Sequence, residues 1–134
     1  MIYSLDANVL RCICHNDAGA AAVLLKLDSL GFATCGISAI VAYELHRATL
    51  NFRLTRSTRS ALSAYLAKLP VIAFDGEDAA AAAQLEREIK GNTPGVNDLM
   101  IAAQARRRGL VVVTDNVKHF QRVPRLVVEN WLKP

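Results

Sequence analysis

The stretch LVVVTDN, residues 110–116, decides the fold class. Its first four residues form a continuous apolar run, rich in valine, of the kind found in a strand covered on both faces. Thr114, Asp115 and Asn116 follow at once. In open α/β sheets, ligands bind just beyond the carboxyl ends of the strands. The stretch therefore predicts a parallel sheet and marks Asp115 as a candidate functional residue.

Further apolar runs alternate with helical patterns on the amino-terminal side of this stretch. The predicted strands cover residues 2–5, 33–37, 70–74 and 110–113. The predicted helices cover residues 8–14, 17–30, 39–50, 56–69, 77–90 and 99–108. Ser38 and Asn97 precede two of these helices as expected N-caps. Alternating strands and helices predict an α/β fold, with three α/β/α layers around a central, mainly parallel sheet.

Composition favours one compact domain over residues 1–134. The chain is 52% apolar and 21% charged, so it can bury enough surface to fold. No stretch approaches the ~18–20 apolar residues of a membrane span, and Asp6 interrupts the first apolar run where a signal peptide needs an uncharged core. We therefore expect a soluble, cytoplasmic protein with no membrane contact. A net charge of +4 suits a polyanionic partner.

The three cysteines do not predict a disulfide framework or a zinc site. Their number is odd, and a chain of this size does not need covalent cross-links to fold. Cys12 and Cys14 lie two residues apart on a predicted helix, so they point to nearly opposite sides. No second ligand pair follows at zinc-finger spacing.

Two aspartates end predicted strands. Asp6 closes the first apolar run and Asp115 closes the run at 110–113. If these strands are neighbours, their backbones lie roughly 4.8 Å apart. Carboxylates that close repel each other unless one is protonated or a cation lies between them. For either residue alone, a helix N-cap is an equally good interpretation.

Glu44 is an acid on the apolar face of its predicted helix. Ile40 and Val41 precede Glu44 by four and three residues, and Ala48 follows it by four. All three apolar residues therefore lie on the same helix face as Glu44. A carboxylate in such surroundings is costly unless it meets a partner. We expect an arginine, a protonated acid or a metal ion there, and a structural salt bridge is the alternative.

Asp98 lies at the start of the predicted helix 99–108, where the helix dipole alone favours an acid. Because Asn97 is expected to supply the cap, we also expect Asp98 near the mouth of the sheet. Four acids from separate elements could then converge. Such an all-oxygen site binds Mg²⁺ or Mn²⁺, ions that promote phosphodiester hydrolysis. The phosphate-binding loops of nucleotide-binding proteins are absent from the sequence.

With these acids located, the sequence resembles the PIN-domain ribonucleases, and within them the VapC-like toxins of toxin–antitoxin pairs. The segments that carry the resemblance are YSLDANVL, ISAIVAYEL, GVNDLMIAAQA, VVVTDNVKHF and RVPRLVVENW. The resemblance implies a PIN-like fold and a Mg²⁺- or Mn²⁺-dependent endoribonuclease. Asp6, Glu44 and Asp98 would hold the metal directly or through water, and Asp115 would complete the site. Some members of the family cut transfer RNA.

The same resemblance assigns supporting roles. Asn8, Thr114 and Asn116 would orient the acids or the substrate, because metal-bound carboxylates need hydrogen-bonding neighbours. Ala7 stands where the family often has threonine, so one hydroxyl is missing here. His119 stands where other members carry an acid, which leaves Asp115 as the least certain of the four acids.

Basic and apolar side chains indicate the partners. Arg47, Arg53 and Lys118 flank the acids in sequence and could attract RNA phosphates. Residues 106–108, three arginines at a helix end, are expected to be structural first. The resemblance further implies a cognate antitoxin and a homodimer. Leu50, Phe52 and Leu54 could serve such contacts, although ordinary core packing is the better interpretation of all three.

Two other functions stay open at this point. One is a catalytically silent PIN-like binding module that acts with its antitoxin in transcriptional autoregulation. The other is a phosphorylation-controlled signalling domain, which also carries acids at strand ends. That class needs a pair of adjacent acids after the first strand, whereas Asp6 is followed by Ala7 and Asn8. Metal binding separates the enzyme from the silent module.

Overall fold

The computed structural model describes residues 1–91 and 93–133. Within them, a single sheet has the strand order β3-β2-β1-β4-β5, and every pairing is parallel. The strands are β1 (Tyr3–Leu5), β2 (Cys35–Ser38), β3 (Val71–Ile72), β4 (Val111–Val113) and β5 (Val128–Glu129). The predicted parallel sheet is confirmed, and the first strand lies at its centre.

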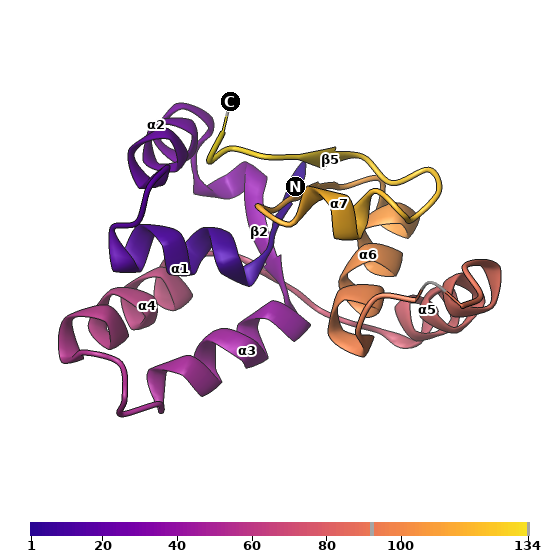
Figure 1. The fold of residues 1–134 in the computed structure, drawn as a ribbon, viewed down its shortest axis with the longest axis horizontal. Helices are drawn as coiled ribbons and strands as arrows, with labels where there is room; N and C mark the ends of the chain where they lie inside the picture. The colour runs from indigo at the N-terminus through magenta and orange to yellow at the C-terminus, as the bar shows by residue number, and fades with distance from the viewer. Residues whose placement is uncertain (92, 134) are drawn as a thin grey trace.

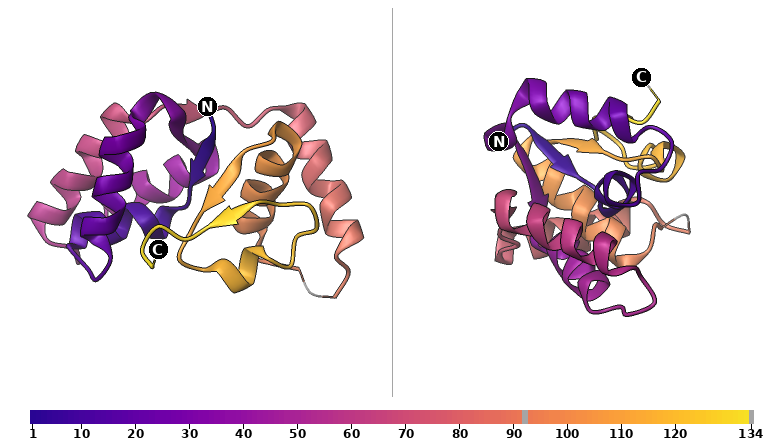
Figure 2. Two further views of the ribbon diagram at one scale, coloured as in Figure 1. Left: turned by 90° about the horizontal axis from the view of Figure 1, so that it is seen from above. Right: turned by 90° about the vertical axis from the view of Figure 1, so that its left-hand side faces the viewer.

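Helices cover both faces of this sheet. They are α1 (Ala7–His15), α2 (Ala20–Leu30), α3 (Ala39–Thr49), α4 (Arg56–Lys68), α5 (Gly76–Glu88), α6 (Val96–Arg108) and the short α7 (Val117–Phe120), with one 3-10 turn, η1 (Phe32–Thr34). Figure 1 shows α1, α2 and α4 at one end of the molecule and α5 at the other. Figure 2 shows the strands between these two groups of helices. The predicted α/β/α architecture is therefore confirmed.

The centre of the sheet is the core of the protein. Leu5, Val112 and Val113 have no exposed surface. Leu5 pairs with Val113, and the backbone amide of Asp6 donates to the Val113 carbonyl oxygen at 2.8 Å. This register brings Asp6 and Thr114 side by side where β1 and β4 end, which is the edge of the sheet predicted for the site.

Several predicted boundaries differ from the structure. Helix α6 begins at Val96 with Gly95 as its N-cap, so the prediction of Asn97 as the cap was wrong. Asn97 and Asp98 instead lie inside the first helical turn. Helix α2 begins three residues later than predicted, because Gly19 adopts a left-handed conformation with a φ of 93°. By contrast, Ser38 is confirmed as the N-cap of α3, where its hydroxyl accepts from the Ile40 amide.

A network of ion pairs joins α5 to α6. Asp78 is fully buried, yet its carboxylate accepts from Arg107 at 2.9 Å and from Arg108 at 2.8 Å. The Gln104 side chain donates to it as well. Arg106 pairs with Glu88 at 2.9 Å. The structural role expected for the three arginines is confirmed. They form ion pairs with carboxylates of α5 and its N-cap, in addition to their interaction with the helix dipole.

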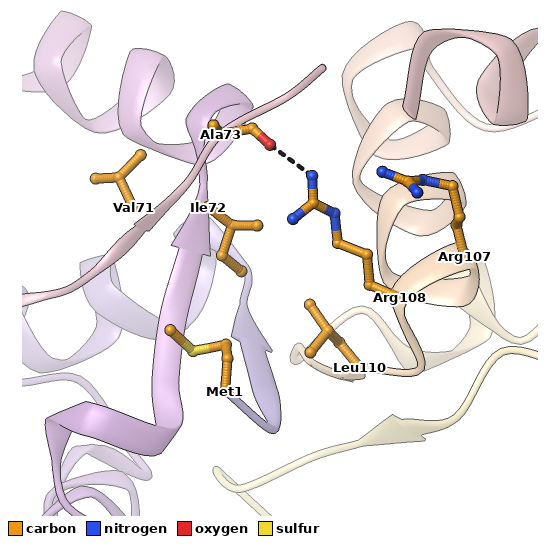
Figure 3. Close-up of a pocket in the computed structure, with 7 residues that line it drawn as sticks. All are labelled: Met1, Val71, Ile72, Ala73, Arg107, Arg108 and Leu110. Atoms are coloured by element: carbon orange, nitrogen blue, oxygen red, sulfur yellow. Dashed lines mark hydrogen bonds between the residues drawn. The ribbon is translucent and has the colours of Figure 1, made fainter. Parts of the chain in front are cut away.

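A pocket of about 570 Å³ opens beside this network. Figure 3 shows Met1, the β3 residues, Leu110 and the two arginines around it, with Arg108 donating to the Ala73 carbonyl oxygen. None of the four candidate acids lines this pocket. Its arginines are already paired with carboxylates, so it is not a phosphate site.

The apolar residues after α3 are not all in the core. Leu50 is 72% exposed and Phe52 is 78% exposed, so the preference for core packing was wrong for both. Leu54 is half-buried and packs against the core, as preferred. The loop turns outward here, and the Arg59 guanidinium lies 4.4 Å from the centre of the Phe52 ring. Leu50 and Phe52 therefore remain available for a partner.

The three cysteines are free thiols. Burial raises the pKa of Cys14 to about 11, which leaves it protonated near neutral pH. Among the described residues, none of the helices combines the length and apolar character that a membrane crossing requires.

Candidate active site

Asp6 lies at the carboxyl end of the central strand and is also the N-cap of α1. Its side chain is nearly buried, and it accepts from the Ala7 amide at 2.9 Å and from the Thr114 hydroxyl at 2.8 Å. Burial raises the pKa of Asp6, the Thr114 hydrogen bond partly opposes the rise, and the charge of Asp98 adds to it. The two interpretations of Asp6, cap and site residue, are therefore compatible.

Thr114 organises the hydrogen bonds around Asp6. While its hydroxyl donates to Asp6, its oxygen accepts from the Asn8 side chain at 3.3 Å and from the backbone amide of Asn116 at 3.0 Å. All three residues predicted to support the acids thus lie in one hydrogen-bonded group. Asn116 takes part through its backbone.

Glu44 projects from α3 toward Asp6 with one oxygen unpaired. Its Oε1 atom is buried and has no hydrogen-bond partner among the described residues. Burial raises the pKa of Glu44, and the charge of Asp6 raises it further. Arg11 and Arg47 act in the opposite direction, although neither forms an ion pair with Glu44 in the described part of the chain. The alternative of a structural salt bridge is therefore not supported.

Asp98 faces the other two acids from the first turn of α6. Its charge contributes to the raised pKa values of both Asp6 and Glu44, which places the three acids in one electrostatic group. Its Oδ2 atom lies 3.0 Å from Nε2 of His119 on α7. Sequence reasoning did not place His119 in the site, although its position in the VVVTDNVKHF segment was a usable signal.

Asp115 lies beside this group but in different surroundings. Its backbone amide donates to Asn8 at 3.3 Å, and its Oδ1 accepts from Asn130 at 3.2 Å. It lines a separate pocket of about 400 Å³ together with Asp17 and Cys12. Its charge is not among the main influences on the pKa of Asp6 or Glu44. Its role as the fourth acid stays a prediction.

The residues of the site suit a divalent cation. Across residues 1–91 and 93–133, no three acid, imidazole or thiol groups already surround one point at metal-binding distance. Asp6 and Asp98 instead contact Thr114 and His119. However, Glu44 has a buried oxygen without a partner, and the pKa values of Asp6 and Glu44 are raised by burial and by the neighbouring negative charges. A cation bound between these acids would offset both effects. Carboxylate oxygens are the ligands that Mg²⁺ and Mn²⁺ prefer.

The predicted basic residues differ in their placement. Arg47 lines a pocket of about 340 Å³ that also contains Glu44. Arg53 and Lys118 are exposed and outside that pocket. Their assignment to RNA binding stays a prediction.

The chain is similar in sequence and fold to known proteins of one family. The model of the PIN domain family matches residues 3–126. The chain belongs to the PIN-domain family, in its VapC branch. It is 33% identical to ribonuclease VapC2 of Rickettsia felis over 99% of this chain and the whole of that protein. It is also 33% identical to the tRNA(fMet)-specific endonuclease VapC of Salmonella typhimurium, over 71% of this chain and 74% of that one.

Solved VapBC structures share the same fold. The Rickettsia felis VapBC2 structure, bound to a DNA fragment from its promoter, matches this PIN domain with a TM-score of 0.80 and 30% identity over 98% of this chain and 99% of that one. DNA-bound VapBC of Salmonella typhimurium matches with a TM-score of 0.82 and 28% identity over 98% of both chains. Because these matches span nearly the whole VapC fold, the PIN-like architecture is confirmed.

Proposed function

We propose that this PIN domain is a Mg²⁺- or Mn²⁺-dependent endoribonuclease that serves as the toxin of a toxin–antitoxin pair. The observation that carries the proposal is the electrostatic group of Asp6, Glu44 and Asp98, in which Glu44 keeps a buried, unpaired oxygen. Relatives named ribonuclease and endonuclease support the nuclease activity.

The side chains have distinct roles in this proposal. Asp6, Glu44 and Asp98 would hold the ion, and Asp115 is proposed to complete the site. When bound, the ion supplies a water of lowered pKa and stabilises the leaving oxygen. Thr114 and the Ala7 amide each hold one oxygen of Asp6, and His119 holds one oxygen of Asp98, so these contacts orient the two acids. The neighbouring arginines offset the negative charge that would otherwise repel RNA.

Transfer RNA is the substrate class that we propose to test first. The Salmonella typhimurium and Shigella flexneri relatives are both named tRNA(fMet)-specific endonucleases. Only 6% of this chain is aromatic, so it offers few rings on which unpaired bases could stack. A folded RNA, bound through its backbone and shape, fits this composition better than a long single strand.

An antitoxin and a second copy of the chain are the proposed protein partners. The structural relatives were solved as VapBC complexes, which supports an antitoxin. Two of those complexes are bound to DNA, which supports a part in transcriptional autoregulation with the antitoxin; a catalytically silent module with that part alone is the second candidate function. That module would need neither the unpaired Glu44 oxygen nor a cation.

Cleavage by the purified protein tests the proposal. With Mg²⁺ or Mn²⁺, we expect the wild type to cut RNA at internal positions and Asp6→Asn and Glu44→Gln to lose about 10²-fold or more of the rate with unchanged circular dichroism. Equal activity in either variant would defeat the site assignment. If the wild type neither cuts RNA nor binds Mn²⁺ in calorimetry, yet binds its antitoxin, the silent module is the correct reading.

A further inference from the structure

The pocket that contains Glu44 continues as a groove between α1 and α3. Arg11 and His15 lie four residues apart on α1, so they share one helix face. Glu44, Arg47 and Ala48 lie three and four residues apart on α3 and share another face, and Asn51 follows in the loop after this helix. The two helices contact each other, and Figure 1 shows them extending in the same general direction from the sheet. The groove therefore contains Glu44, one of the candidate acids, together with basic and polar side chains of both helices and the loop after α3.

The arginines of this groove are not used by the protein itself. Among the described residues, neither Arg11 nor Arg47 has a carboxylate within 4.0 Å, whereas each of the arginines at 106–108 has at least one. The Arg47 guanidinium lies 5.5 Å from the centre of the Tyr43 ring. Arg11 influences the pKa of both Asp6 and Glu44, so its charge reaches the acids. Two unpaired guanidinium groups thus lie directly beside the proposed cleavage site.

Charge favours this side of α1 over the other. Arg11 and His15 also border the 400 Å³ pocket on the opposite side of the helix, but that pocket contains Asp17 and Asp115. In the groove, Glu44 is the only acid among the lining residues, and the proposed ion would neutralise it. A polyanion that leaves the acids along α1 would therefore follow the groove.

We propose that the groove between α1 and α3 binds the phosphates of the RNA strand on one side of the cut bond. This inference rests on the proposed function and extends it. Planar guanidinium groups bind phosphate through two parallel hydrogen bonds, and the side chains of His15 and Asn51 add donors. Contacts of this kind fix the register of the strand without reading its bases. The groove thus positions the scissile phosphate over the acids.

The salt dependence of RNA binding tests this inference directly. Binding of a labelled substrate RNA is measured with metal withheld, so that no cleavage occurs. We expect Arg11→Gln combined with Arg47→Gln to weaken binding about tenfold or more. The slope of log K against log salt should fall by about 1.4, which is about 0.7 for each lost phosphate contact. Arg87→Gln is the matched control, because Arg87 is exposed on α5 at the opposite end of the molecule.

Shortened substrates give a second readout. The effect of Arg47→Gln on kcat/KM should be large for RNAs that extend on one side of the cut and absent for RNAs truncated on that side. Equal losses for both sets, or a slope unchanged relative to Arg87→Gln, would overturn the inference. So would variants that lose antitoxin binding but keep RNA binding. If the wild type itself neither binds nor cuts RNA, the proposed function fails, and the groove assignment fails with it. If the wild type binds and cuts RNA, and the variants bind RNA as tightly and with the same salt dependence, only the groove assignment fails.

Discussion

One hydroxyl group, that of Thr114, links the candidate site to the centre of the sheet. Leu5 and Val113 are paired, so the residues that follow them, Asp6 and Thr114, lie next to each other. The Thr114 hydroxyl donates to the Asp6 carboxylate. The same oxygen accepts from Asn8 and from Asn116. Thr114 is fully buried, so these contacts exclude water. The orientation of Asp6 therefore depends on a residue 108 positions away.

Thr114→Val keeps the shape of the side chain and removes this hydroxyl. We expect the folded protein to lose about 1.5 to 3 kcal/mol, the usual value of a hydrogen bond to a charged group. The affinity for Mn²⁺ should fall about 10-fold to 100-fold, because Asp6 loses the group that orients it. Chemical denaturation and titration calorimetry measure the two effects. Thr114→Ser retains the hydroxyl, and a loss of similar size in that variant would argue against the hydrogen bond as the cause.

The raised pKa values of Asp6 and Glu44 predict how stability depends on pH. Each carboxyl binds its proton more tightly in the folded state than in the unfolded state. The metal-free protein should therefore lose stability as the pH rises from about 4 through the folded pKa values. Divalent cations should abolish this loss. Thermal unfolding between pH 4 and pH 7, with and without Mg²⁺, measures it.

Glu44→Gln isolates one of these charges. In the absence of metal, its Tm at pH 7 should exceed that of the wild type by about 2 to 5 °C, the shift that roughly 1 kcal/mol produces in a domain of this size. The difference should vanish at pH 4, where the wild-type carboxyl is protonated. A Tm that is lower at both pH values would show that Glu44 stabilises the fold and is not under repulsion.

The acids themselves were predictable at this scale where they interrupt an apolar pattern or end an apolar run. Asp6 and Glu44 were identified in this way, whereas Asp98 was chosen as an acid at a helix start, behind a cap that the structure places at Gly95. The charges of all three affect one another through the pKa values of Asp6 and Glu44. The contact between His119 and Asp98 was not predicted, since it depends on how α7 turns back after β4. The position of His119 in the VVVTDNVKHF segment pointed to the site but not to this partner.

At the scale of elements, α6 is held by side chains from the helix before it. Asp78, fully buried in α5, accepts from Arg107, Arg108 and Gln104. Burial alone would raise the pKa of Asp78, but these donors, Arg108 first, hold it far below its ordinary value. The stabilisation is therefore fully present above the unfolded pKa of about 4 and is lost progressively as the pH falls from there through the lowered folded pKa. Because Asp98 opens α6, this network also sets the position of a site residue.

Asp78→Ala leaves two arginines without a buried partner. We expect a loss of about 3 kcal/mol in the free energy of unfolding, measured by urea denaturation at pH 7. Glu77→Ala is the control, because Glu77 pairs with Arg107 but its side chain is 81% exposed. That change should cost less than about 1 kcal/mol. Similar losses in the two variants would contradict the importance of burial.

Elements that carry a helical period or an apolar run were predictable, whereas β5 and α7 were not. Helices α3 and α4 and the strand β4 agree with the sequence to within one or two residues. Strand β5 has two residues and exists because its backbone pairs with β4, and α7 is a single turn. Neither has enough residues to show a period. The misplaced start of α6 has a similar cause, because Gly95 provides no side-chain cap to recognise.

At the scale of the whole molecule, the exposed residues after α3 bear on assembly. Leu50 and Phe52 expose most of their apolar surface to solvent, and Tyr43 on α3 is 58% exposed as well. Large exposed apolar side chains are the first candidates for an interaction surface. This surface is the one on which the proposed homodimer would depend.

Leu50→Ser combined with Phe52→Ser should weaken self-association about tenfold or more, measured by sedimentation over a range of concentrations. Leu24→Ser combined with Leu25→Ser is the comparison variant, since these two leucines are the exposed apolar pair on α2, and a larger effect there would place the interface on that helix. An unchanged dimer in the double variant would place the interface elsewhere. A wild type that is monomeric at all concentrations would contradict the homodimer itself.

The pairing of β1 with β4 also determines when the site can form during refolding. The hydrogen bond from Thr114 to Asp6 spans 108 positions, and β1 pairs with strands from both halves of the chain. Pairings between such distant segments form slowly, because the chain between them must first be brought together. Local helices can form in microseconds, yet none of them alone assembles the three acids. Cation binding during refolding should therefore appear only in the slowest kinetic phase, together with the final native signal.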